Sequence, residues 1–214
     1  MSRKTLLNKT VLITAGPTRE YLDPVRYLTN SSSGRMGYAL SKTSKEMGAK
    51  VLLVSGPTGL KPPEGVKTVF VKTALQMRNA VRKLSCKADI MIFSAAVCDY
   101  RPRRPLKEKI KSTKKFLEIT LVKNPDIIKE AASGKGGRKI IGFALETGGL
   151  IKNAKKKLID KKLDMIVANP AGNMEKPTGS AVIMLENGRT IKVPRTDKVK
   201  LSKIIMEAAA GLLK

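Results

Sequence analysis

Residues 26–37, RYLTNSSSGRMG, are the segment around which the predicted architecture is arranged. They lie between two apolar runs, residues 11–13 and 51–54, whose branched side chains are typical of strands buried on both faces of a parallel sheet. Residues 14–18 and the polar loop after them predict no regular structure, whereas a helix is predicted from Gly37 to about Met47. The pattern predicts a βαβ unit with a long loop of small residues at the helix N-terminus. There, backbone N–H groups and the helix dipole favour an anion such as phosphate.

The alternation of strand and helix continues through most of the chain. Further strands are predicted over residues 66–71, 89–93, 139–144 and 164–168. The intervening helices include one that begins with a capping box, Thr73 and Gln76, and a basic one over residues 150–162. This alternation indicates an α/β, Rossmann-like fold with a doubly wound, mostly parallel sheet and ligands at the carboxyl ends of its strands. Asn187-Gly188 between two apolar runs predicts an added antiparallel hairpin.

The middle of the chain departs from this alternation. Residues 101–115 hold eight basic residues against one acid, with prolines that prevent a helix. Apolar residues then alternate with polar ones over residues 117–121, which predicts a half-buried strand. Asn124 and Pro125 follow, and they predict the N-cap and first residue of a short helix.

The composition limits both the class of protein and its chemistry. With 214 residues, of which 42% are hydrophobic, we predict a single domain over residues 1–214. We find no apolar run of membrane-spanning length and no signal-peptide core, so we expect a cytoplasmic protein without a membrane partner. Histidine is absent, which excludes Ser-His-Asp and Cys-His catalysis and imidazole metal sites.

The charge is strongly basic. Lysine and arginine outnumber aspartate and glutamate by 43 to 17, for a net charge of +26. This excess favours a polyanionic partner, namely nucleic acid, anionic lipid or a multiply phosphorylated small molecule, although a lysine-rich solvated surface has the same composition. Four tyrosines, four phenylalanines and no tryptophan leave few stacking platforms for bases, so we expect no nucleic-acid partner.

Several residues have both a chemical and a structural interpretation. Asp99 follows a predicted strand, where it could hold Mg²⁺ for a polyphosphate or pair with Arg101 or Arg103. Lys157 and Lys161, four residues apart, could align along a phosphate chain or lie on a solvated helix face. The long Ser/Gly loop could bind an anion or simply connect two elements. It lacks the G-x-G-x-x-G spacing, and the second strand lacks the acidic residue, that a nicotinamide cofactor requires.

A series of short motifs runs in order along the chain. They are TAGPTRE (14–20), DPVRY (23–27), Asn30, SSGRMG (32–37), VSGP (54–57), SAAV (94–97), DYR (99–101), EKIK (108–111), KNPDI (123–127), GFA (142–144), ET (146–147), LD (163–164) and AN (168–169). Together they closely resemble the phosphopantothenate–cysteine ligase family of coenzyme A biosynthesis. No flavin-dependent decarboxylase domain precedes them in this sequence, so the resemblance implies a stand-alone ligase or the ligase half of a fusion.

The resemblance implies an acid–amino-acid ligase that forms an amide bond. The family joins 4′-phosphopantothenate to L-cysteine with a nucleoside triphosphate, CTP in most bacterial and archaeal members and ATP in many eukaryotic ones. An acyl-nucleotidylate forms first with release of pyrophosphate, and the cysteine amine then displaces the nucleotide. We expect CTP here, with Mg²⁺ as cofactor and a decarboxylase, separate or fused, as a partner. The chain departs from the family pattern at Ser112, at Pro170 and over residues 173–179, which leaves CTP or ATP open.

The resemblance also implies which residues form the site. The nucleotide and acyl sites would contain Phe93, Ser94, Ala95, Ala96, Asp99, Lys109, Pro125, Asp126, Ile127, Ile128, Phe143, Lys157 and Lys161, with Asp99 as the metal ligand. Asn30 would contact the activated acyl group as a neutral donor. Arg26 would reach the same group from the partner subunit of a homodimer. The catalytic candidates are thus Asn30, Arg26 and Lys109. Attack on a phosphate builds negative charge on its oxygens, and lysines with Mg²⁺ would neutralise that charge.

Overall fold

Eight strands form the central sheet of the computed structural model, which describes residues 4–111, 115–170, 172 and 176–213. Their order across the sheet is β12-β11-β10-β9-β6-β1-β4-β5. Their bounds are β1 (Thr10–Ala15), β4 (Lys50–Ser55), β5 (Lys67–Phe70), β6 (Ile90–Phe93), β9 (Lys139–Glu146), β10 (Met165–Pro170), β11 (Thr178–Leu185) and β12 (Thr190–Asp197). The six neighbouring strands β10, β9, β6, β1, β4 and β5 pair in parallel. Strands β11 and β12 add the predicted antiparallel hairpin at the β10 side. The chain leaves β1 in one direction for β4 and β5 and returns on its other side for β6, β9 and β10. The predicted doubly wound, Rossmann-like α/β fold is therefore confirmed.

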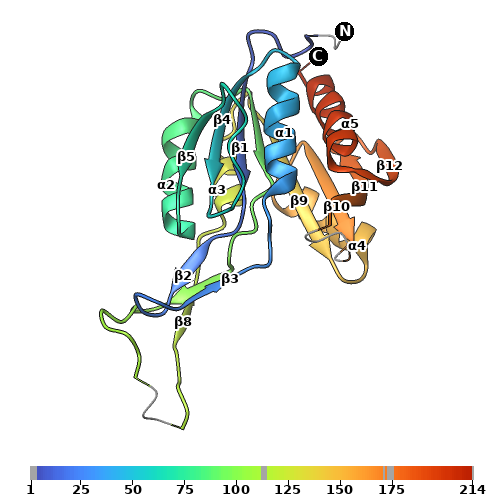
Figure 1. Ribbon diagram of the computed structural model, residues 1–214. Helices are drawn as coiled ribbons and strands as arrows, with labels where there is room; N and C mark the ends of the chain where they lie inside the picture. The colour runs from blue at the N-terminus through green and yellow to red at the C-terminus, as the bar shows by residue number, and fades with distance from the viewer. Residues whose placement is uncertain (1–3, 112–114, 171, 173–175, 214) are drawn as a thin grey trace.

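Helices cover both faces of this sheet (Figure 1). On one face, α1 (Arg35–Glu46) packs beside α5 (Lys198–Gly211). The other face carries α2 (Ala74–Ser85), α3 (Ile127–Ser133) and α4 (Leu150–Asp160). Successive residues of β1 alternate between the two layers, with Val11 and Ile13 in the core under α1 and Leu12 in the core under α2. The capping box of α2, Thr73 with Gln76, forms as predicted.

Two small antiparallel ribbons project from the carboxyl end of the sheet. One pairs β2 (Arg19–Tyr21) with β3 (Tyr27–Thr29), and the other pairs β7 (Tyr100–Pro102) with β8 (Leu121–Lys123). They pack together and extend away from the body (Figure 1); we call the described residues of 19–29 and 100–123 the arm. The prediction of no regular structure after Ile13 was wrong here, because β1 continues to Ala15 and the polar loop contains the β2–β3 hairpin.

Two predictions for the middle of the chain were also wrong. Leu117 and Ile119 are 54% and 40% exposed and belong to no strand, so the half-buried strand is reduced to β8. Helix α3 begins two residues later than predicted, because Asp126 is its N-cap and accepts the Lys129 N–H. Asn124 is instead buried, and its side chain donates to the Cys98 carbonyl at 2.8 Å.

Candidate functional site

The site is built where the loops after β1 and β6 meet, at the point where the strand order reverses. Hydrogen bonds tie the two loops together: the Ala96 N–H donates to the Gly16 carbonyl at 2.9 Å, and the Ser94 hydroxyl donates to the Thr14 carbonyl at 2.7 Å. Helix α1 begins next to these loops, since Gly37 in its first turn lies against Ala15 and Ser94. A Cβ on Gly37 would lie 2.4 Å from the Ala15 side chain, so only glycine permits this close approach.

The N-terminus of α1 is open toward these loops. Its N-cap, Gly34, has φ +74 and makes no side-chain cap hydrogen bond. The left-handed backbone there favours glycine, and a Cβ would also lie 2.8 Å from the Thr58 side chain. Backbone N–H groups of the first turn therefore remain available for an anion, which is the geometry that the Ser/Gly loop predicts.

Three adjoining hollows lie at this end of the sheet, and two of them include the start of α1 in their linings. The first, about 290 Å³, lies beside β6 and α3, and the second, about 180 Å³, lies beneath the start of α1. These two share Ala95 and Phe143 in their linings. The third, about 770 Å³, shares Ser32, Ser33 and Arg35 with the second. Ligand groups bound in neighbouring hollows would thus lie next to one another.

Most of the predicted nucleotide residues line the first hollow. These are Phe93, Ala95, Asp99, Pro125, Asp126, Ile127, Ile128, Phe143 and Lys161. The second hollow is lined by Ser94 and Ala96, again with Ala95 and Phe143. Lys109 and Lys157 are not among the residues that line either one. The fold therefore collects the predicted residues of β6, β9 and α3 and leaves two of the predicted lysines outside.

Asp99 lies exposed at the mouth of the first hollow. Among the residues that the structure describes, no lysine or arginine lies within ion-pair distance of its carboxylate. Arg101 donates instead to the Lys123 carbonyl and to Asn124. In the same described part of the chain, no three Asp, Glu or Cys side chains gather as a metal cluster.

The two predicted nucleotide-site lysines in and after α4, Lys157 and Lys161, are each paired with a carboxylate. Lys161 lies 2.8 Å from Asp126 at the edge of the first hollow, and Lys157 lies 2.7 Å from Glu146. Burial alone would raise the pKa of Asp126, but the hydrogen bonds from Lys161 and from the Lys129 N–H, with the charges of these two lysines, together lower it. The hydrogen bond from Lys157 likewise lowers the pKa of Glu146. In this geometry, the two ammonium groups are not aligned as a pair along one phosphate chain.

Asn30 is anchored by its own amide nitrogen. Nδ2 donates to the carbonyls of Ala96 at 3.2 Å and Val97 at 3.1 Å, so both N–H groups have acceptors. Oδ1 accepts no hydrogen bond from a described residue, and Asn30 is one of the residues that line the third hollow. Asn30 is not among the described residues with positive φ, which excludes a left-handed turn as the reason for this asparagine. The amide donor that the sequence predicts is therefore engaged with the backbone.

Arg26 and Lys109 lie together on the arm. Arg26 Nη1 is 2.7 Å from Asp23 Oδ2 and donates to the carbonyl of Ile110, the residue after Lys109, at 3.0 Å. None of these residues lines the first two hollows. Asp23 was missed by sequence reasoning, although Asp before Pro at the start of a turn is a recognisable signal for a side chain that binds the backbone.

Other sequence predictions fall near the C-terminal loop. Pro170 ends β10 beside Asn169, which lines the second hollow with a buried Oδ1 that has no hydrogen-bond partner in the described chain. Asn169 was not predicted as a site residue, although it directly follows the four buried residues 165–168 at the carboxyl end of β10. Ser112 and residues 173–175 lie outside the described residues.

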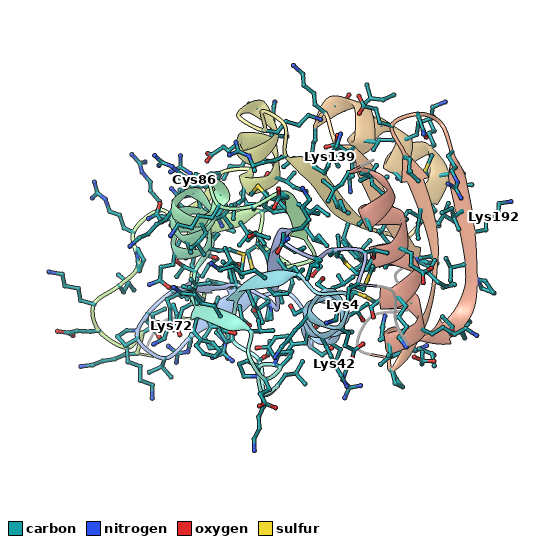
Figure 2. The ribbon with its side chains drawn as sticks, turned by 90° about the horizontal axis from the view of Figure 1, so that it is seen from above. Lys4, Lys42, Lys72, Cys86, Lys139 and Lys192 are labelled. Atoms are coloured by element: carbon teal, nitrogen blue, oxygen red, sulfur yellow. The ribbon has the colours of Figure 1, made fainter. Side chains whose placement is uncertain are left out.

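The basic charge is spread over the molecule. Figure 2 shows Lys42, Lys72 and Lys192 on different sides, and all three are exposed. This distribution matches a solvated lysine-rich surface as well as a polyanion partner, so charge alone assigns no nucleic-acid interface. Among the described residues, we find no helix with the length and hydropathy of a membrane span.

Comparison with known proteins gives consistent matches over nearly the whole chain. Residues 6–212 match the family described as "DNA/pantothenate metabolism flavoprotein C-terminal domain". The chain is 44% identical over 209 residues to the coenzyme A biosynthesis bifunctional protein CoaBC of Vibrio cholerae, covering 95% of this chain and 52% of that protein. For CoaBC of Bacillus subtilis the identity is 38%, covering 98% and 53%. The chain thus spans about half the length of these curated relatives.

A solved structure matches over nearly the full length of both chains. It is the crystal structure of the C-terminal domain of a coenzyme A biosynthesis bifunctional protein CoaBC, with a TM-score of 0.85 and 39% identity. The match covers 98% of this chain and 98% of that one.

Proposed function

The chain belongs to the family of DNA/pantothenate metabolism flavoprotein C-terminal domains, and from this premise we propose that it is a phosphopantothenate–cysteine ligase of coenzyme A biosynthesis. It would join 4′-phosphopantothenate to L-cysteine through an acyl-nucleotidylate, with CTP as the preferred nucleotide and release of pyrophosphate. The observation that carries the proposal is that nine of the predicted nucleotide-site residues line one hollow at the strand-order reversal. The identity to the CoaBC proteins supports the same reaction.

The adjoining hollows suit a reaction in two stages. A nucleotide in the first hollow would extend its phosphates into the adjoining second hollow, which is lined by the start of α1, where the helix N-terminus favours negative charge. The carboxylate of phosphopantothenate, bound beside Asn30, would then lie next to the α-phosphate of the nucleotide and could attack it. Neither this attack nor displacement by the cysteine amine needs an imidazole, in agreement with the absence of histidine.

One assay tests the proposed function. Pyrophosphate release is measured with CTP and with ATP, each with phosphopantothenate and Mg²⁺, before and after cysteine is added. We expect release that depends on phosphopantothenate and is faster with CTP, and an amide product only after cysteine. Faster release with ATP would reverse the nucleotide assignment, and no release with either nucleotide would contradict the ligase.

Asp99 fits a magnesium site of the kind that nucleotides complete. Mg²⁺ usually takes one or two carboxylates together with phosphate oxygens and water, and Asp99 offers one unpaired carboxylate at the first hollow. When bound, the ion would neutralise phosphate charge in the activation stage. Asp99→Asn keeps the shape and removes the charge, so we expect the Mg²⁺ concentration for half-maximal pyrophosphate release to rise at least about tenfold. The melting temperature should stay unchanged; the reverse pattern would make Asp99 a structural residue.

We also propose a homodimer with shared sites, in which the arm of one subunit serves its partner. Arg26 contacts the backbone beside Lys109, so both residues would enter the same site. A mixture of Arg26→Ala and Lys109→Gln should therefore recover no activity. Mixing Lys109→Gln with Lys161→Gln, a variant of the body, should recover roughly one quarter, since half of randomly exchanged dimers are mixed and each has one intact site of two.

The mixing experiment requires independent proof that subunits exchange. Recovery in the first mixture would place Arg26 and Lys109 in different sites. Its absence in the second would return Lys109 to the site of its own subunit.

Because the relatives are bifunctional, we propose that the ligase acts beside a flavin-dependent decarboxylase, fused or separate.

A further inference from the structure

Asp23 is a buried carboxylate that makes four hydrogen bonds. It is 1% exposed, at the turn between β2 and β3. Its Oδ1 accepts from the N–H groups of Val25 and Arg26, each at 2.7 Å. Its Oδ2 accepts from Arg26 Nη1 at 2.7 Å and from the N–H of Ile110 at 3.0 Å. The first two bonds shape the local turn, but the last one reaches a segment far away in the sequence.

The Ile110 peptide is held from both sides. Asp23 accepts its N–H, and Arg26 donates to its carbonyl at 3.0 Å. A second connection lies nearby, where the N–H of Leu106 donates to the Leu22 carbonyl at 2.8 Å. Ile110 stands between Lys109 and Lys111, so the backbone from which both lysines project is attached to the β2–β3 turn.

Asp23 stays ionised in this setting. Burial alone would raise its pKa, but hydrogen bonds from Ile110, Arg26 and Val25 together hold the pKa of the carboxyl well below its usual range. A charged acceptor makes stronger hydrogen bonds than a neutral one, and it also fixes the guanidinium of Arg26. The attachment is therefore a charge-assisted clamp across two distant parts of the chain.

We propose that Asp23 is a positioning residue that holds the Lys109–Lys111 segment, so that Lys109 is presented in a fixed orientation. Nothing in the assigned site includes Asp23, which lines none of the three hollows. The kinetic part of this inference rests on the proposed ligase function, because Lys109 has a chemical task only there. The structural part, restraint of the segment, stands without it.

Limited trypsin digestion of the native full chain tests the restraint directly. Cleavage after Lys107 and Lys109 is followed by mass spectrometry for the wild type and for Asp23→Asn. We expect the initial rates to rise at least about tenfold, because loss of the clamp lowers the free energy of local opening. The matched control is Asp89→Asn. The Asp89 carboxylate accepts the Thr10 N–H at the amino ends of the central strands β1 and β6, and this substitution should leave these rates unchanged. Equal rates in Asp23→Asn and wild type would overturn the proposal.

A second variant covers the case in which Asp23→Asn does not fold. Ile110→Pro removes the N–H that Asp23 accepts and leaves the β2–β3 turn intact. Its cleavage is read after Lys107 alone, because trypsin does not cut before proline. We expect faster cleavage there too, and an unchanged rate would count against the clamp.

A double-mutant cycle tests whether Asp23 acts through Lys109. Asp23→Asn should slow saturated pyrophosphate release about tenfold in the wild-type background, but less than about threefold in Lys109→Gln, because residues that act as a unit are not additive. Equal effects in both backgrounds would overturn the link to Lys109. If the wild type releases no pyrophosphate, the proposed function fails, while the trypsin result still decides the clamp.

Discussion

Replacing Lys109 with glutamine is expected to slow pyrophosphate release by at least about two orders of magnitude. In the proposed reaction, the ammonium group neutralises charge on the phosphate oxygens, and such a charged hydrogen bond in a closed site is worth roughly 2–4 kcal/mol. Lys109 is exposed on the arm and forms no ion pair with a described residue. Its loss should therefore leave the melting temperature unchanged.

The matched control is Lys111→Gln, on the other side of the clamped Ile110 peptide. It removes the same charge from the same segment, and we expect a milder effect. Single-turnover release of pyrophosphate from saturated enzyme is the measurement. A rate for Lys109→Gln within about threefold of wild type would contradict the assigned role, because a lost charged contact to the reacting phosphate costs more than this.

Replacing Asn30 with aspartate is expected to block the second stage and spare the first. Nδ2 now donates to the Ala96 and Val97 carbonyls, and a carboxylate would instead place negative charge against those two oxygens and against the acyl group. We expect acyl-nucleotidylate to form and accumulate, with aminolysis by cysteine slowed by about two to three orders of magnitude, because the added negative charge opposes the charge that develops on the acyl oxygen.

A quenched single turnover, with the nucleotide species separated, measures both stages. Asn187→Asp, in the distant β11–β12 turn, is the control for the same chemical change and should behave as wild type. Normal aminolysis in Asn30→Asp would contradict a catalytic role. An equal loss of both stages with a lower melting temperature would mean that Asn30 only anchors the β6 loop.

The layers of the fold could be predicted from the sequence alone. Runs such as residues 11–13 and 90–93 are apolar throughout because both faces of a parallel strand are buried, and the helices between them have one apolar face. Thr73 with Gln76 and Asn187-Gly188 were interpreted correctly, because caps and tight turns depend on neighbouring residues. The family motifs also identified most of the residues that line the first hollow.

The pairing of distant side chains, in contrast, depends on the folded arrangement of the chain. The bond from Ile110 to Asp23 joins residues 87 positions apart, and the Lys161–Asp126 pair likewise joins two separate helices. The same is true of Asn30, whose amide nitrogen is engaged by carbonyls of the β6 loop. Periodicity records whether a residue is buried within its own element. Periodicity does not predict which polar partner the folded chain brings to that residue, because such contacts are few, long-range and not repeated along the sequence.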